Sequence, residues 1–271
     1  MVERALKGSV SQIVIVDRTR APLRALEPPV DIAIVCVKTQ GTAWAADVAK
    51  RLLSPNGMAI TLQNGLGNFE RLADAVADRA AVGVIYVGAR LDESGALQAT
   101  GPGRAELGKP RNTRALEKFE ALVAALGMGG MTVTPKDDPW PSVWRKVVTN
   151  AAVNPTTALL GVVNSELLGD RAAGRVADGL AREVARVATA AGVPIAEEDA
   201  VMWWREMAQL TGANRSSMLQ DVEAHRATEI DAICGEVYRE GQRRGVGAPL
   251  NQAMTVLVSA LQPADRASPQ L

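Results

Sequence analysis

The chain has 271 residues, and its 30 Lys and Arg balance its 30 Asp and Glu, which gives a formal net charge of zero and a pI near 6.6. Apolar residues make up 47% of the chain, enough for a buried core, so a disordered or fibrous protein is excluded. No basic excess exists to bind nucleic acid, no apolar run reaches the roughly 18 residues of a membrane span, and two distant cysteines with one histidine argue against disulfides or a metal site. The amino terminus lacks the apolar segment of a secretory signal, so we expect a reduced, cytoplasmic, globular protein.

The first half of the chain, residues 1 to 136, alternates short apolar runs with segments of helical spacing. The runs are typical of strands and cover 12–16, 31–37, 57–63 and 81–87, with helices expected at 41–53 and 69–76. Because the run at 31–37 is almost wholly apolar, we expect a strand buried on both faces of a parallel sheet. Glycine-rich turns indicate edge strands around 96–108 and 131–134. Strands that alternate with helices favour an α/β domain.

The second half, residues 137 to 271, is predicted to be helical. Pro135, Pro139 and Pro141 mark the change of pattern. Beyond them, helical spacing covers 143–160, 171–191, 197–210, 217–244 and 249–261. The sequence therefore predicts an α/β domain over 1–136 followed by an all-α domain over 137–271.

The segment W-R-K-V-V-T-N-A-A-V-N-P contains the most informative polar residues. Lys146, Asn150 and Asn154 are spaced four residues apart, so they form one stripe on a helix that is otherwise apolar. An ammonium and two carboxamides are costly to bury without partners, which favours a functional site. The alternative is an ordinary amphipathic helix with a solvated polar face. Pro155 is expected to break or kink the helix just after Asn154.

A second candidate segment covers residues 215–231. Ser217 followed by Gln220 matches a capping box, so Ser217 is equally well explained as the N-cap residue of a helix. Glu229 precedes apolar positions that face the core, and on its own it is equally well a solvated charge or a site carboxylate. His225 has no partner at a suitable spacing and is interpreted as structural or exposed.

The third candidate segment, L-Q-N-G-L-G-N, follows a predicted strand. Ligands of open α/β sheets lie at the carboxyl ends of the strands. Gly65 and Gly67 would let the backbone approach a ligand, and Asn64 offers both a donor and an acceptor. Lys38 also follows a buried strand, where an ammonium could meet a phosphate. A tight strand-to-helix turn explains the glycines equally well.

Five motifs taken together resemble the ketopantoate reductase (2-dehydropantoate 2-reductase) family in their order and spacing. They are V-D-I-A-I-V-C-V-K-T-Q, L-Q-N-G-L-G-N, G-P-G-R-A-E-L-G, W-R-K-V-V-T-N-A-A-V-N-P and S-S-M-L-Q-D-V-E-A-H-R-A-T-E-I-D. The resemblance extends from about residue 10 to residue 261, and the last two motifs are the most discriminating.

The resemblance implies a partial Rossmann-type parallel sheet and a helical domain of the 6-phosphogluconate dehydrogenase type, with the active site in the cleft between them. It implies NADPH-dependent reduction of 2-dehydropantoate to pantoate, a step of pantothenate and coenzyme A biosynthesis. Lys146 would be the general acid that protonates the carbonyl oxygen as the hydride arrives. The substrate carboxylate and hydroxyl would be held by Asn150, Asn154, Ser217 and Glu229, and the cofactor by Lys38, Asn64 and Gly65. Lys38 would lie near the adenosine 2′-phosphate, and Asn64 where nicotinamide and substrate meet.

One element of the family pattern is absent from this sequence. The family has a G-x-G-x-x-G turn after its first strand, and the backbone of that turn holds the pyrophosphate. The nearest strings, at 65–70 and 101–106, lack the third glycine and lie too far along the fold. The later motifs align the start of the chain with about the third strand of the family, and an alternative places Q-I-V-I-V-D-R at the second strand. We therefore expect the chain as written to bind NADPH weakly.

Three hypotheses about function stay open on the sequence alone. The chain is a truncated ketopantoate reductase, a reductase of another 2-oxo acid, or a non-catalytic remnant that serves as a helical dimerisation or small-acid-binding module. The expected partner is a small 2-oxo acid, and a homodimer is one possible assembly. No nucleic-acid, membrane or metal partner is expected.

Overall fold

The computed structural model describes residues 29–87, 89–91, 97–99, 103–169 and 171–261. The strand predicted at 12–16 lies outside these residues. The chain forms two compact units. The first runs up to Gln63 and continues over Asn68–Pro139, and the second combines Asn64–Gly67 with the chain from Trp140 onward.

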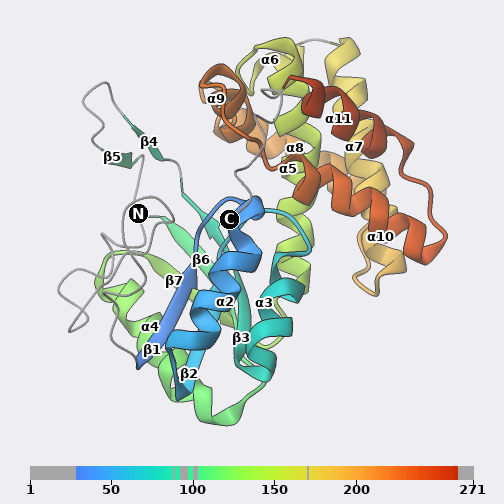
Figure 1. Cartoon of the computed structure of the whole chain (residues 1–271). Coiled ribbons are helices and arrows are strands. Elements are labelled where there is room, and N and C mark those ends of the chain that lie inside the picture. Colours follow the sequence, from blue (N-terminus) through green and yellow to red (C-terminus); the bar gives the residue numbers. More distant parts are fainter. Residues whose placement is uncertain (1–28, 88, 92–96, 100–102, 170, 262–271) are drawn as a thin grey trace. The chain divides into compact units, whose positions relative to one another are not determined.

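A five-stranded sheet forms the centre of the first unit (Figure 1). Its strands lie in the order β1 (Val30–Val35), β2 (Leu53–Thr61), β3 (Ala80–Tyr86), β6 (Arg104–Gly108) and β7 (Thr132–Lys136). Neighbours are parallel except β3 and β6, which are antiparallel. The prediction of edge strands is wrong for β6, which lies between β3 and β7. The chain reverses direction through the β4–β5 hairpin (Ala89–Leu91 and Leu97–Ala99), so it returns beside β3 as an antiparallel neighbour.

Strand β1 differs from its prediction. Its side chains contact the cores on both faces of the sheet, Ile32 and Ile34 on one and Val35 on the other. Burial is less complete than predicted, because Asp31 is exposed and only Val35 is fully buried. Among the described strands, β1 pairs with β2 alone. A strand with one described neighbour has less of the sheet beside it, which is consistent with its partial burial.

Helices cover both faces of the sheet. The helices α2 (Thr42–Leu52) and α3 (Asn68–Val76) pack on one core that contains Ala59. The helix α4 (Leu116–Met128) packs on the opposite core, which contains Met58 and Ile60. This alternation follows from the two-residue period of a strand. The sequence interpretation did not name α4, although Phe119, Leu122 and Leu126 have helical spacing.

The second unit is helical, as predicted. Its helices are α5 (Trp140–Leu160), α6 (Glu166–Gly169), α7 (Arg171–Ala190), α8 (Glu197–Leu210), α9 (Ser217–Glu223), a π-helix η5 (Asp231–Gly235), α10 (Glu236–Arg244) and α11 (Pro249–Ala260). Helix α7 packs against both α5 and α8. None of the helices in the described part of the chain is long and apolar enough to cross a membrane.

The helices correct the sequence predictions at two points. The predicted helix 217–244 is broken after Glu223, where His225 has a left-handed φ of 49° and Arg226 N–H bonds back to the Asp221 carbonyl at 2.8 Å. Of the break or kink expected at Pro155, the break is absent, because α5 continues to Leu160, in agreement with the helical spacing predicted over 143–160. Proline removes one helical hydrogen bond, but the turn around it is buried and stays helical.

Candidate active site

Helix α5 carries the predicted polar stripe. Lys146 and Asn150 are half-buried, and Asn154 is buried beside Pro155. Within the described residues, no hydrogen bond joins the side-chain carboxamide of Asn150 or Asn154 to another group. Because a carboxamide offers two donors and one acceptor, these two groups are available to a polar ligand.

Glu229 and Asn64 form the second part of the site. Asn64 Nδ2 donates to Glu229 Oε2 at 3.0 Å, and the Glu229 side chain is almost fully buried. The two residues are far apart in the sequence but belong to the same compact unit. Glu229 lies where the chain passes from α9 to the π-helix, directly before Ile230. The break after α9 that the sequence interpretation missed is therefore what presents this carboxylate.

The environment of Lys146 changes its acidity. Burial lowers the pKa of Lys146 from 10.5 to about 8, and the negative charge of Glu229 opposes that shift. A pKa of about 8 leaves the ammonium protonated at neutral pH and able to release its proton within the working range of an enzyme. The arrangement of a half-buried ammonium, a buried carboxylate and three carboxamides suits proton donation to a small polar substrate.

The loop Asn64–Gly67 is seated on the π-helix. Leu66 N–H donates to the Ala232 carbonyl at 2.8 Å, and Gly65 has a φ of 82°. A Cβ on Gly65 would lie 2.3 Å from the Ala232 carbonyl oxygen. Contact with Ala232 thus explains the glycine, and the approach of Gly65 to a cofactor stays a prediction.

The start of α9 corrects the capping prediction by one residue. Ser216, not Ser217, is the cap: its Oγ accepts Leu219 N–H at 3.1 Å and also receives a hydrogen bond from Thr157 Oγ1 at 2.7 Å. Ser217 is exposed at the first position of α9. The capping box fits Ser217 with Gln220 but not Ser216, which has Leu219 three residues on, so the pattern indicated the wrong serine. In the structure the Gln220 side chain donates instead to the Arg215 carbonyl at 2.9 Å.

The carboxyl ends of β1 and β2 contain a polar network that the sequence interpretation did not name. Gln63 Nε2 donates to the Val37 carbonyl and to Thr42 Oγ1, both at 2.8 Å, and Thr42 donates to Asn68 Oδ1 at 2.9 Å. Lys38 lies beside this network, exposed after β1, and its carbonyl accepts Gly41 N–H. Ligands of α/β sheets lie at this end of the strands, so the exposed Lys38 ammonium suits a phosphate.

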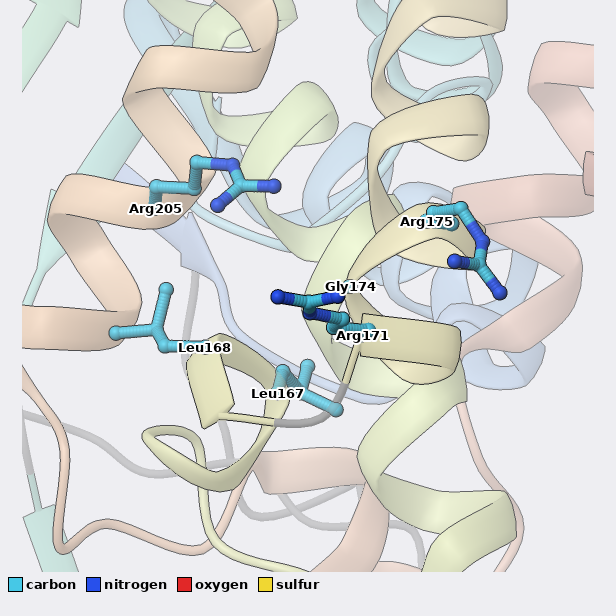
Figure 2. A pocket seen from close by; sticks show the side chains of 6 residues that line it. All are labelled: Leu167, Leu168, Arg171, Gly174, Arg175 and Arg205. Atoms are coloured by element: carbon cyan, nitrogen blue, oxygen red, sulfur yellow. The ribbon is translucent and has the colours of Figure 1, made fainter.

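A separate hollow of about 220 Å³ lies among α6, α7 and α8 (Figure 2). It is lined by Leu167, Leu168, Arg171, Gly174, Arg175 and Arg205. None of the predicted site residues lines it. Among the described residues, no group of three His, Cys, Asp or Glu side chains could hold a metal ion.

The comparisons with known proteins agree with the sequence motifs. Two family models match, "Ketopantoate reductase PanE/ApbA" over residues 5–112 and "Ketopantoate reductase PanE/ApbA C terminal" over residues 140–262. The 2-dehydropantoate 2-reductase of Halobacterium salinarum is 34% identical over 250 residues, which cover 90% of this chain and 82% of the relative. The chain belongs to the ketopantoate reductase family. The corresponding protein of Archaeoglobus fulgidus is also 34% identical, over 86% of this chain and 76% of its own length.

Solved structures of similar proteins have the same fold. A 2-dehydropantoate 2-reductase from Geobacter metallireducens is 30% identical with a TM-score of 0.76, covering 89% of this chain and 80% of that structure. A complex of D-mandelate dehydrogenase with NADH is 25% identical with a TM-score of 0.78, covering 85% of this chain and 78% of that structure. The resemblance predicted from the motifs is therefore confirmed at the level of family and fold.

Proposed function

We propose that this chain reduces 2-dehydropantoate to pantoate with NADPH; its relatives are named 2-dehydropantoate 2-reductases. The observation that carries the proposal is the contact of Asn64 with Glu229 beside Lys146, whose pKa is lowered to about 8. NADPH, when bound, supplies the hydride to the carbonyl carbon. Lys146 Nζ donates a proton to the carbonyl oxygen, so that the developing alkoxide becomes a neutral hydroxyl.

The charges of the substrate and of the side chains suggest what each remaining site residue binds. A carboxylate repels the acid group of the substrate, so Glu229 is suited instead to accept the hydrogen bond of the substrate hydroxyl through its second oxygen. The free carboxamides of Asn150 and Asn154 and the exposed hydroxyl of Ser217 can donate to the substrate carboxylate. The substrate would then be oriented by donors at one end and by an acceptor at the other.

The cofactor assignment depends on the donors that the chain offers. Lys38 is exposed and fits a phosphate group, and we assign Asn64, which donates to Glu229, to the nicotinamide. Gly65 lies close to the Ala232 carbonyl, so this contact does not provide a binding site for the pyrophosphate. We propose Lys38 and Asn64 as the cofactor contacts among the described residues.

Turnover with purified protein tests the proposed function. Because the sequence predicts weak NADPH binding, the assay uses high NADPH concentrations. Under these conditions we expect NADPH oxidation that depends on 2-dehydropantoate, with pantoate identified as the product by mass spectrometry. Calorimetric titration of the same protein with NADPH separates a failure to bind cofactor from a failure of chemistry. Binding of NADPH without reduction of any 2-oxo acid would contradict the proposal.

A second substrate is suggested by the likeness to D-mandelate dehydrogenase. Benzoylformate, the 2-oxo acid related to mandelate, carries a phenyl ring and has no hydroxyl for Glu229. A buried acceptor that is left unpaired disfavours such a substrate strongly. We therefore expect kcat/KM for 2-dehydropantoate to exceed that for benzoylformate, and the reverse order would favour the second function.

A further inference from the structure

A single turn of π-helix, Asp231–Gly235, follows Glu229 almost directly and leads into α10; we call it the π-turn. In a π-turn the helical hydrogen bonds are shifted by one residue, and such turns are frequent at functional sites. Glu236 N–H bonds to the Asp231 carbonyl, five residues back. The Ala232 carbonyl accepts Leu66 N–H from the loop that carries Asn64. The π-turn therefore joins the two segments that supply Glu229 and Asn64.

The guanidinium of Arg239 binds Asp231, the first residue of the π-turn, and Glu236, the residue directly after it. Its Nη1 donates to Asp231 Oδ1 at 2.9 Å, and its Nη2 lies 3.0 Å from Asp231 Oδ2, 3.0 Å from the Asp231 carbonyl oxygen and 3.1 Å from Glu236 Oε1. A single exposed ion pair contributes little to stability, but a two-pronged arginine–carboxylate pair fixes geometry. Because Asp231 is two residues from Glu229, this contact restrains the chain close to the site.

Gly235 gives Arg239 and Asp231 the room that they need. A Cβ on Gly235 would lie 2.7 Å from Asp231 Oδ1 and 3.3 Å from Arg239 Nη2. Its backbone is helical, so no left-handed conformation explains the glycine. A Cβ at this position would displace the side chains of Asp231 and Arg239 from their present contact.

We propose that Arg239 is a positioning residue of this enzyme: by holding Asp231 and Glu236 it fixes the π-turn, and through the π-turn it keeps Glu229 and the loop Asn64–Gly67 in place beside Lys146. The inference rests on the proposed function, because it concerns the same site. Arg239 acts here through Glu229 and touches neither substrate nor reacting atoms.

The alternative role, an ion pair that only adds stability, differs in its effect on Lys146. The charge of Glu229 raises the pKa of Lys146, so a displaced Glu229 lowers it. Loss of the Arg239 charge without displacement removes a repulsion and acts in the opposite direction. The sign of the change therefore separates the two roles.

Other buried carboxylates next to α5 are already held by partners. Glu183 on α7 accepts the N–H groups of Leu250 and Asn251, each at 2.9 Å. Asp221 on α9 accepts from Arg226 at 3.1 Å. Glu229 is the group whose charge acts on Lys146, so a shift in the pKa of Lys146 reports on Glu229.

The test compares Arg239→Gln and Arg239→Lys with Arg244→Gln as the matched control. Arg244 lies on the same helix and pairs with Glu240, away from the π-turn. Three quantities are measured: the melting temperature, the pH profile of kcat/KM for 2-dehydropantoate, and the pKa of Lys146. The last comes from NMR of ¹³C-methylated lysines, assigned with Lys146→Arg, and needs no turnover.

We expect Arg239→Gln to reduce kcat/KM by roughly 10- to 100-fold, mainly through KM, since small misplacements of site groups have effects of that size. The pKa of Lys146 should fall below its value of about 8, and Arg244→Gln should leave both quantities unchanged. Arg239→Lys keeps the positive charge but loses the two-pronged guanidinium, so the pKa of Lys146 should also fall in this variant, but to a smaller extent. It also decides the question if Arg239→Gln does not fold.

A folded Arg239 variant with an unchanged or raised pKa of Lys146, and with kcat/KM equal to that of Arg244→Gln, would overturn the positioning role. If the wild-type chain does not reduce 2-dehydropantoate, the proposed function fails by itself. The NMR titration still decides the role of Arg239 in that case, because it follows Lys146 directly.

Discussion

Replacing Glu229 with Gln removes one charge from the site at nearly constant shape, and it should change both substrate binding and the pH profile. A hydrogen bond to a charged acceptor contributes about 1.5–3 kcal/mol. At about 1.4 kcal/mol per factor of ten, its loss raises KM for 2-dehydropantoate by roughly 10- to 150-fold. Glu229 also opposes the shift that burial imposes on Lys146. Without the carboxylate the pKa of Lys146 falls further below about 8, so the alkaline limb of kcat/KM moves to lower pH.

The assay is the initial rate of NADPH oxidation as a function of 2-dehydropantoate concentration over a series of pH values. Glu198→Gln is the matched control, because Glu198 is 81% exposed on α8 and pairs with Arg182. It should leave KM and the pH profile unchanged. An unchanged KM in Glu229→Gln, or an alkaline limb that moves to higher pH, would refute the assignment of Glu229 to the substrate hydroxyl and to Lys146.

Three further predictions follow from the same contacts. Lys146→Met should lower kcat by about 10²- to 10⁴-fold in steady-state assays. The pKa of Lys146 is about 8 in the folded chain and 10.5 for an unburied lysine, so the unfolded chain binds more protons between these two pH values. The melting temperature of the wild type, compared with that of Lys146→Met, should therefore rise as the pH rises over this range. Ser216→Ala should reduce stability by about 0.5–2 kcal/mol in denaturant unfolding, whereas Ser217→Ala should leave stability unchanged and raise KM. Gly65→Ala should lower the melting temperature, because it places a Cβ 2.3 Å from the Ala232 carbonyl oxygen in a left-handed backbone.

Much of the fold was predictable because its signals are local. The apolar runs that became β2 and β3 and the helical spacing of α7 and α8 depend on residues close together in the chain. The antiparallel insertion of β6 was not predictable, because strand order depends on how the hairpin before it turns the chain. The π-turn was missed for a related reason. One extra residue in a helical turn leaves the apolar pattern on either side almost intact.

The site was predictable to a different extent at each position. Lys146, Asn150 and Asn154 could be found from spacing, since a helix places every fourth residue on one stripe. The role of Glu229 could not, because a lone carboxylate has the same sequence pattern whether it is solvated or buried. Its contact with Asn64 joins residues that are distant in the sequence, and only the resemblance to ketopantoate reductases suggested both.

The proposed proton donor and the groups around it lie within one compact unit. Lys146, Glu229 and the π-turn belong to the helical unit, and the short segment Asn64–Gly67 belongs to it as well, although the chain on either side of that segment belongs to the sheet. The Leu66–Ala232 hydrogen bond and the close approach of Gly65 explain why this segment leaves the unit of its neighbours in the sequence. The Asn64 side chain therefore donates to Glu229, the carboxylate that raises the pKa of Lys146. The loop Asn64–Gly67 follows β2 in the chain, but its contacts with Ala232 and Glu229 in the helical unit determine what Asn64 can bind.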